Sequence, residues 1–170
     1  MLDYIKMNLQ LFAAGTLVNA TTTYVNSDTG ATTPFDGTRK EDLVKWAKNE
    51  LAVTGYQVDR QNFGRIEFGE KRIDISFDYL NSPGEYAAIL AVPRVLKRGI
   101  IVGQHASHKY RGFPTITFAA PVEINGVRGN MAVVVKQESK NVYKTHRILM
   151  PDGSAFEYKE NAEPTPATLL

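Results

Sequence analysis

The spacing of apolar residues changes along the chain, and each spacing predicts a different secondary structure. In the first helical segment, apolar side chains recur at the spacing of one helix face: Leu43, Trp46, Ala47 and Leu51. Thr38 and Glu41 stand just before this run in a capping-box pattern. The sequence therefore predicts a helix from about residue 39 to 54, ending before Gly55.

Two more helical segments are predicted before residue 100. Residues 71–80, KRIDISFDYL, fit the spacing of either a strand or a helix, and we favour a helix. Ser82 and Pro83 form a helix-start signal before GEYAAILAVP. The segment PRVLKRG carries basic residues before a glycine, which is typical of a short helical turn and its end.

From residue 100 onward the pattern is that of β-strands. The predicted strands are IIVGQ, PTITFAAPVEI, GNMAVVVKQ, NVYKTHRILM and SAFEY. The pair Asn125-Gly126 between apolar runs predicts a tight hairpin. The run MAVVV is apolar on both faces, as in a central strand covered by helices on at least one side. The predicted fold class is α+β, with N-terminal helices packed on a mostly antiparallel sheet of about five strands.

A chain of 170 residues, 43% hydrophobic, is long enough for one core. We expect residues 1–37 to form an extended leader or arm, because they are rich in Thr, Asn, Ala and Gly. Residues 38–158 then form the α+β domain, and residues 159–170 form a disordered tail.

Composition excludes several classes of function. The chain has no cysteine, so a disulfide framework, a thiolate zinc site and a cysteine nucleophile are excluded. Its apolar runs are too short to cross a bilayer. The net charge of +2 says little about partners, but no acidic residue occurs between Glu85 and Glu123, a stretch that includes Lys97 and Arg98. That stretch should carry a local positive field.

Histidines and cations gather in the β half of the chain. In NVYKTHRILM, a regular alternation places Lys144 and His146 on one face and Tyr143 and Arg147 on the other. A meander brings the later strand beside the earlier one, with the HASHK loop at the strand ends. The sequence thus predicts a cleft formed by His105, His108, Lys109, Arg111, Thr117 and His146.

Metal-independent RNA cleavage suits such a cleft. One group must take the proton of the ribose 2′-hydroxyl, another must protonate the leaving oxygen, and cations must hold the charge on the phosphate. Histidine serves either proton role near neutral pH, and hydroxyl groups position the phosphate. The candidate catalytic residues are His105, His108, His146, Lys109 and Thr117. The candidate nucleic-acid contacts are Arg111, Lys144, Arg147, Tyr143, Lys97 and Arg98.

Other interpretations of the same residues remain open. Histidines in strands and loops are often structural residues, either hydrogen-bonded or exposed, and threonines are natural strand formers. Three histidines allow a zinc site, but no acidic residue stands nearby to complete or orient it. We therefore expect neither a metal nor a cofactor. Aromatic residues beside the cations, among them Tyr110 and Phe113, give part of an RNA-stacking surface.

Segments between residues 42 and 158 carry a resemblance to a known family: DLVKWAKNELAVTGYQVDR, FGEKRIDIS, AVPRVLKRGI, GQHASHKYRGFPTITFAAPVEINGVRGNMAVVVK and YKTHRILMPDGSAF. They resemble a domain found at the ends of phage head proteins of the MuF type and in large polyvalent proteins that enter the host with the phage genome. Such domains are similar to nucleases of the barnase/EndoU/colicin/RelE group.

The resemblance implies helices on an antiparallel sheet and RNA cleavage as a toxin or effector. It carries over to these positions: His105, His108, Lys109, Arg111, Thr117, Tyr143, Lys144, His146 and Arg147. The block lacks the glutamate base of some members, so a histidine mechanism must be assumed. The leader segments MNLQLFA and TTTYVNSDTGATTPFDGT also resemble the start of tailed-phage major capsid proteins.

Three functions follow from these observations. The first is a phage ribonuclease with RNA as substrate, an immunity protein as inhibitor, and a location in the virion or the host cytoplasm. The alternative is a non-enzymatic accessory domain that binds nucleic acid or phage head proteins through the same cleft. A transferase of the ADP-ribosyl or nucleotidyl type is the third, although nothing in the sequence indicates a nicotinamide site.

Overall fold

The computed structural model describes residues 18–20, 23–25, 32–34, 40–80, 85–86, 88–106, 112–124 and 127–150. Several sequence-based predictions lie outside these residues: the cap at Thr38, the start signal at Ser82 and Pro83, the loop residues His108, Lys109 and Arg111, the SAFEY strand and the tail.

Helices form where the apolar spacing predicted them. They are α3 (Lys40–Ala52), α4 (Glu70–Tyr79), the 3-10 helix η1 (Ala88–Ala91) and α6 (Val92–Arg98). The ambiguous segment 71–80 is helical because that conformation buries Ile73, Phe77 and Leu80 together, whereas Asp74 and Asp78 stay exposed. The helix predictions for 39–54 and 71–80 are confirmed.

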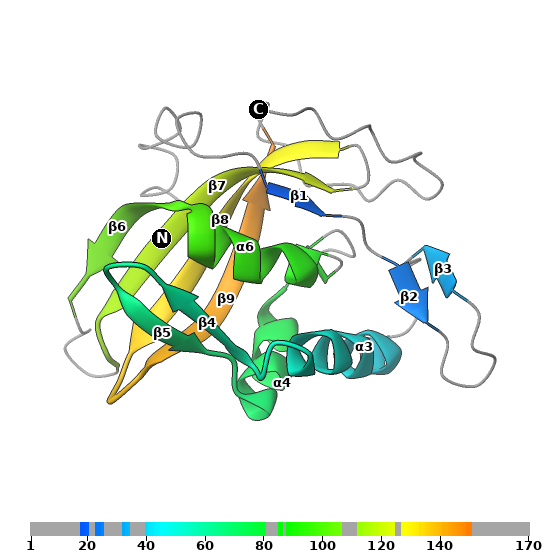
Figure 1. Cartoon of the computed structure of the whole chain (residues 1–170), viewed down its shortest axis with the longest axis horizontal. Coiled ribbons are helices and arrows are strands. Elements are labelled where there is room, and N and C mark those ends of the chain that lie inside the picture. The colour runs from blue at the N-terminus through cyan, green and yellow to red at the C-terminus, as the bar shows by residue number, and fades with distance from the viewer. Residues whose placement is uncertain are drawn as a thin grey trace.

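The described strands form a curled sheet and a separate two-stranded ribbon (Figure 1). Their bounds are β1 (Val18–Ala20), β2 (Thr23–Val25), β3 (Thr32–Pro34), β4 (Gln57–Arg60), β5 (Gly64–Glu67), β6 (Ile100–His105), β7 (Thr115–Ile124), β8 (Val127–Gln137) and β9 (Asn141–Leu149). Within the described residues the sheet has seven strands in the order β1-β7-β8-β9-β5-β4, with β6 also paired to β7. Strands β2 and β3 form the ribbon.

The predicted α+β class is confirmed. Strands β6 to β9 form an antiparallel meander, and β8, which contains MAVVV, is its central strand between β7 and β9. The β7–β8 pairing runs without interruption to Ile124 opposite Val127, which is the pairing expected of a hairpin at Asn125-Gly126.

The short β4–β5 hairpin did not appear in the predicted elements. Each strand has only four residues and one large apolar side chain, Val58 in β4 and Ile66 in β5, which is too little for a clear period. Asn62 in its turn and Gly64 at the start of β5 take positive φ angles of 61° and 118°. Strand β5 extends the sheet by pairing in parallel with β9, and β1 from the leader pairs in parallel with β7.

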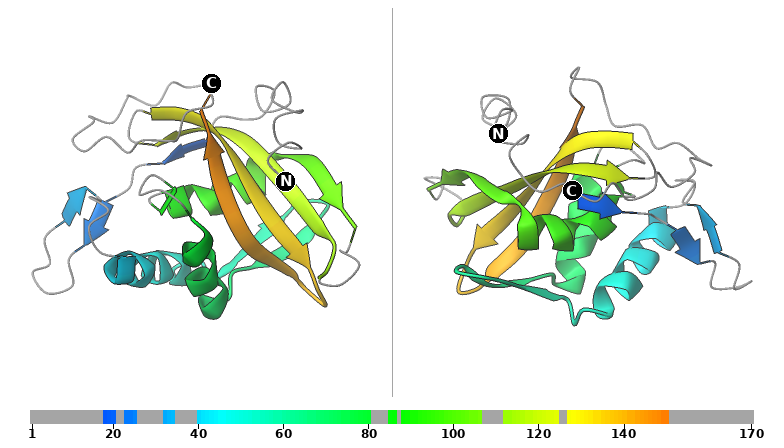
Figure 2. Two further views of the ribbon diagram at one scale, coloured as in Figure 1. Left: turned by 180° about the vertical axis from the view of Figure 1, so that it is seen from behind. Right: turned by 45° about the horizontal axis from the view of Figure 1, so that its top comes forward.

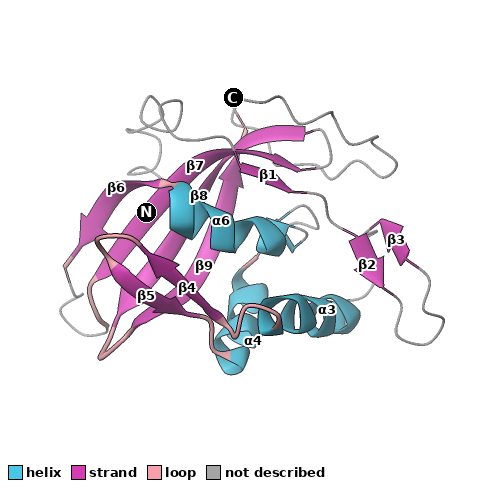
Figure 3. Cartoon of the chain, viewed as in Figure 1, coloured by secondary structure: helices cyan, strands magenta, loops and turns pink. Residues whose placement is uncertain are grey.

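Helices α4 and α6 cover one face of the meander, which we call the helix-covered face (Figure 3). The larger core lies beneath them, with members Ile73, Phe77, Leu96, Phe118, Val133 and Tyr143. Burying one such side chain stabilises the fold by about 1.5–3 kcal/mol. The opposite face holds a smaller cluster that includes Val102, Ala119 and Ala132. No described helix lies over that face of β7, β8 and β9 in the view from behind (Figure 2).

Gly99 joins α6 to β6 where two backbones approach closely. A Cβ atom at this position would lie 2.5 Å from the carbonyl oxygen of Val95 and 2.7 Å from that of Ala119. Its φ of −68° is ordinary, so the glycine is needed for space and not for a left-handed turn. The glycine stop predicted after LKR is therefore confirmed, with packing as its reason.

Arg60 closes the curl of the sheet by binding the end of α6. From β4, its guanidinium donates one hydrogen bond to the carbonyl oxygen of Leu96 and one to that of Gly99, each 2.7 Å long. Its Cζ also lies 4.8 Å from the ring centre of Phe118. A cation suits the last carbonyls of a helix, although burial lowers the pKa of this guanidinium.

We predict that Arg60→Ala destabilises the protein, because it removes two charge-assisted hydrogen bonds and the contact with Phe118. The free energy of unfolding, measured by urea denaturation, should fall by about 2–3 kcal/mol. Arg65→Ala is the matched control. Its exposed pair with Asp59, 3.0 Å long, should contribute less than about 1 kcal/mol. Equal losses in the two variants would contradict a role for Arg60 in closing the sheet.

Candidate nucleic-acid interface

Strand β9 contains a bulge at Lys144. Thr145 and Tyr143 pair with adjacent residues of β8, so the register passes over Lys144. A bulge of this kind interrupts the alternation of side chains between the two faces. Tyr143 and His146 consequently point to the same, helix-covered face. The regular alternation predicted them on opposite faces, and that prediction is wrong.

Tyr143 and His146 belong to a buried chain of hydrogen bonds. The Tyr143 hydroxyl lies 2.7 Å from Ser76 Oγ of α4 and 2.6 Å from His146 Nδ1. His146 Nε2 lies 2.6 Å from the backbone carbonyl oxygen of Glu85. Ser76, Tyr143 and His146 are each 0% exposed. The chain thus joins α4, β9 and the segment at residues 85–86.

The direction of these hydrogen bonds follows from the backbone carbonyl of Glu85, which can only accept. Because the Glu85 carbonyl has no proton, His146 Nε2 must carry hydrogen and donate to it. In the neutral ring, Nδ1 then accepts the Tyr143 proton, and the Ser76 hydroxyl donates to the Tyr143 oxygen. Every ring nitrogen and hydroxyl oxygen of the chain has a partner, as a buried polar group requires.

Burial keeps this chain neutral. Desolvation lowers the pKa of His146 to about 4, although its hydrogen bond to Glu85 acts in the opposite direction. Desolvation also raises the pKa of the Tyr143 hydroxyl above its ordinary value. His146 reaches no solvent, so its predicted place in an open cleft is wrong. The same burial removes Tyr143 from any direct contact with nucleic acid.

His105 lies on the other face of the sheet. It ends β6 opposite Thr115, whereas His146 pairs with Val133 of β8. Three steps between neighbouring strands, each about 4.8 Å, separate β6 from β9. The structure therefore does not bring His105 and His146 into one pocket, and the two-histidine cleft is not formed.

The other predicted contacts are scattered. Thr117 is only 1% exposed within β7, too buried to position a phosphate. Lys97 and Arg98 are exposed, but they lie at the opposite end of β6 from His105: they come just before its first residue, and His105 is its last. Lys144 is exposed at the bulge.

Arg147 contacts an acidic residue rather than an open surface. It is partly buried, and its Nη1 lies 3.2 Å from Glu85 Oε2. His146 binds the backbone of the same glutamate, so residues 146 and 147 hold Glu85 from both its backbone and its side chain. This contact gives Arg147 a structural role at β9.

A different group gathers where β6, β7 and β8 meet at one end of the sheet. We call it the sheet-end patch and define it as His105, Phe113, Thr115 and Lys136. His105, Thr115 and Lys136 face one another across three neighbouring strands. Phe113 lies just before β7, and Lys136 Nζ lies 4.5 Å from the centre of its ring.

The patch is accessible and held in place by the backbone. His105 is exposed, Phe113 is 48% exposed, and Thr115 is partly buried. The amide of Gln137 donates a 2.7 Å hydrogen bond to the carbonyl oxygen of Pro114, which fixes the Phe113 segment against the end of β8. A flat aromatic face therefore lies beside an ammonium group, with an imidazole and a hydroxyl nearby.

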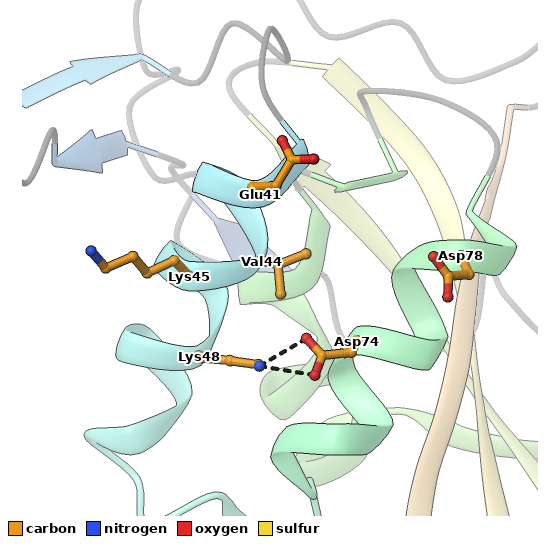
Figure 4. A pocket seen from close by; sticks show the side chains of 6 residues that line it. All are labelled: Glu41, Val44, Lys45, Lys48, Asp74 and Asp78. Atoms are coloured by element: carbon orange, nitrogen blue, oxygen red, sulfur yellow. Dashed lines mark hydrogen bonds and ion pairs between the residues drawn. The ribbon is translucent and has the colours of Figure 1, made fainter.

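A cavity of about 460 Å³ lies elsewhere, between α3 and α4 (Figure 4). Its lining is Glu41, Val44, Lys45, Lys48, Asp74 and Asp78. Lys48 and Asp74 already pair across it, with a 2.8 Å contact. None of the predicted site residues lines this cavity.

Among the described residues, no cluster of three or more His, Cys, Asp or Glu side chains stands in a position to hold a metal ion. No helix in the described part of the chain is long and apolar enough to cross a membrane.

Comparison with known proteins finds one family. The family described as large polyvalent protein-associated domain 3 matches residues 8–146, which include the bulge, the buried chain and the sheet-end patch. The match begins at residue 8, within the predicted leader, and includes β1, which joins the sheet. No curated protein and no solved structure matches the chain.

We predict that Tyr143→Phe is strongly destabilising, because it leaves Ser76 and His146 Nδ1 without their shared partner in a buried site. The free energy of unfolding should fall by about 2–4 kcal/mol in urea denaturation. Tyr86→Phe is the matched control, since its hydroxyl makes one 3.2 Å bond to the Leu80 carbonyl at a partly buried position, and should cost about 1 kcal/mol. A smaller loss at Tyr143 than at Tyr86 would show that the chain contributes little.

The low pKa of His146 predicts a pH-dependent stability. Between pH 4 and pH 6.5 the unfolded chain binds a proton at this residue and the folded protein does not, so stability should fall as the pH drops through that window. The loss should amount to a few kcal/mol. Denaturation of wild type and His146→Gln at a series of pH values measures it, with His105→Gln as the control that retains the dependence. An unchanged pH profile in His146→Gln would contradict this assignment.

Proposed function

The chain belongs to the large polyvalent protein-associated domain 3 family, and we propose that it is a non-enzymatic domain that binds single-stranded RNA through the sheet-end patch. The observation that carries the proposal is the contact between Lys136 and the exposed ring of Phe113. Proteins that bind single strands combine aromatic faces for the bases with cations for the backbone.

Each group of the patch matches one part of a nucleotide. The ring of Phe113 offers a face for a base, and stacking of this kind contributes about 1–3 kcal/mol per base. Lys136 supplies the charge for the adjoining phosphate. His105 and Thr115 offer an imidazole and a hydroxyl that suit a ribose 2′-hydroxyl, the group that distinguishes RNA from DNA.

A single strand suits this surface better than a duplex. In a duplex both faces of each base are covered by neighbouring bases, so Phe113 would have no base face to contact. An unpaired strand exposes its bases and follows a short groove or sheet edge without large deformation. The small size of the patch also fits one or two nucleotides.

The place of His146 supports binding without cleavage. RNA cleavage through the 2′-hydroxyl requires a base and an acid beside the same phosphate. His146 is buried and neutral on the helix-covered face, and among the described histidines only His105 is accessible. The patch itself therefore supplies one imidazole where that reaction requires two proton carriers.

The family match supports a polyvalent protein as the context of the domain. We further propose that this protein belongs to a phage or mobile element, is present in the virion or the host cytoplasm, and brings the domain into contact with RNA and neighbouring phage head proteins. A domain that binds without cleaving needs no immunity protein.

RNA binding can be tested by fluorescence anisotropy with a labelled single-stranded RNA. Phe113→Ala should weaken binding about tenfold or more, because it removes the stacking face. Ile101→Ala is the matched control, since Ile101 is another exposed apolar side chain, 41% exposed on neighbouring β6. Equal effects of the two changes would contradict stacking on Phe113.

The salt dependence tests the phosphate contact. Lys136→Gln should lower the slope of log affinity against log salt by about one, whereas Lys140→Gln in the adjacent turn should change it little. The RNA should remain intact in both cases. Products ending in a 2′,3′-cyclic phosphate that disappear in His105→Gln would overturn the non-enzymatic proposal in favour of cleavage.

A further inference from the structure

We infer that Glu138 acts as a built-in competitor of RNA by holding Lys136 when the sheet-end patch is empty. This inference rests on the proposed function and adds its regulation. It follows from the position of one carboxylate between two cations on different elements.

Glu138 lies in the turn that joins β8 to β9. Its Oε1 atom lies 2.7 Å from Lys136 Nζ of β8 and 3.4 Å from Arg72 Nη2 of α4. The backbone amide of Glu138 donates a 2.9 Å hydrogen bond to the carbonyl oxygen of Lys140, which holds the turn in place. The same ammonium group therefore contacts both the Phe113 ring and the Glu138 carboxylate.

A carboxylate and a phosphate compete for the same ammonium group. Both are anions that accept charge-assisted hydrogen bonds, and Lys136 has one charge to share between them. The hydrogen bond from Lys136 lowers the pKa of Glu138, so this carboxylate stays charged near neutral pH. RNA must therefore displace an anion that is already bound, which reduces its net gain from Lys136.

Arg72 lowers the free-energy cost of replacing Glu138 by a phosphate at Lys136. When a phosphate takes Lys136, Glu138 keeps a cation within 3.4 Å and need not remain alone. The side chains of Glu138, Lys136 and Arg72 are 30%, 20% and 26% exposed, so water reaches all three groups and allows the carboxylate to move. Arg72 consequently favours release of Lys136, although it lies on α4 and outside the patch.

The first experiment compares Glu138→Gln with Glu67→Gln in the RNA anisotropy assay. Both changes remove one negative charge from a carboxylate that pairs with a lysine at this end of the sheet, but Glu67 pairs with Lys140. Glu138→Gln should bind the single-stranded RNA at least fivefold more tightly than wild type, and with a steeper salt slope. Glu67→Gln should change the affinity less than twofold. Equal gains would overturn the inference, because they would reflect net charge alone.

Two further variants separate competition from structural effects. In a Lys136→Gln background, Glu138→Gln should give no gain beyond that of Glu67→Gln, because no ammonium remains to release. Arg72→Gln should weaken RNA binding about twofold or more, since Glu138 then depends on Lys136. Gain in the Lys136→Gln background, or unchanged binding in Arg72→Gln, would overturn the inference. Urea denaturation of each variant verifies that the fold is retained.

The failure of this inference differs from failure of the proposed function. If wild type binds RNA and Phe113→Ala weakens it, but Glu138→Gln matches Glu67→Gln, only the competition by Glu138 is wrong. If neither wild type nor Glu138→Gln binds single-stranded RNA, the proposed function is wrong and the inference fails with it.

Discussion

The structure depends on one buried polar constraint, the hydrogen-bond chain from Ser76 through Tyr143 and His146 to the Glu85 carbonyl. A polar group inside a protein is costly unless each donor and acceptor is paired. This chain satisfies its members only if Tyr143 and His146 share a face, which in turn requires the bulge at Lys144. An irregularity of one strand thus fixes how α4 and the segment at residues 85–86 pack on the sheet.

The same constraint assigns different roles to the two faces of the sheet. A histidine that must donate to a backbone carbonyl and accept from a tyrosine has no capacity left for proton transfer to a substrate. The hydrogen bonds of His146 on the helix-covered face are therefore structural. Polar groups on the other face, from His105 across to Lys136, are in register on neighbouring strands, and this is the end of the sheet where we propose recognition.

Much of the fold was predictable because its signals are local. The spacing of Leu43, Trp46 and Leu51 predicts α3. The Asn125-Gly126 pair predicts a tight hairpin, and the register of that hairpin places Thr115 opposite Lys136, as the β7–β8 pairing shows. Lys136 carries no signal of its own in the sequence, because only its pairing with Thr115 at the end of the hairpin places it in the sheet-end patch. The bulge at Lys144 could not be predicted, because its cause is the match between Tyr143 and a serine on a helix far away in the sequence. Burial of His146 depends on the same long-range contacts.

A surface that combines an aromatic ring with a lysine differs in one physical respect from a catalytic pair of histidines. In the RNA complex that we propose, the contacts do not require a proton to move, so affinity would depend on stacking and salt, whereas the protonation of the buried His146 would affect stability. The acidic neighbour of Lys136 then has a clear consequence. In the site that we propose, RNA binds without turnover, so the strength of binding depends on what the RNA must displace. That group is the carboxylate of Glu138, which also lies 3.4 Å from Arg72.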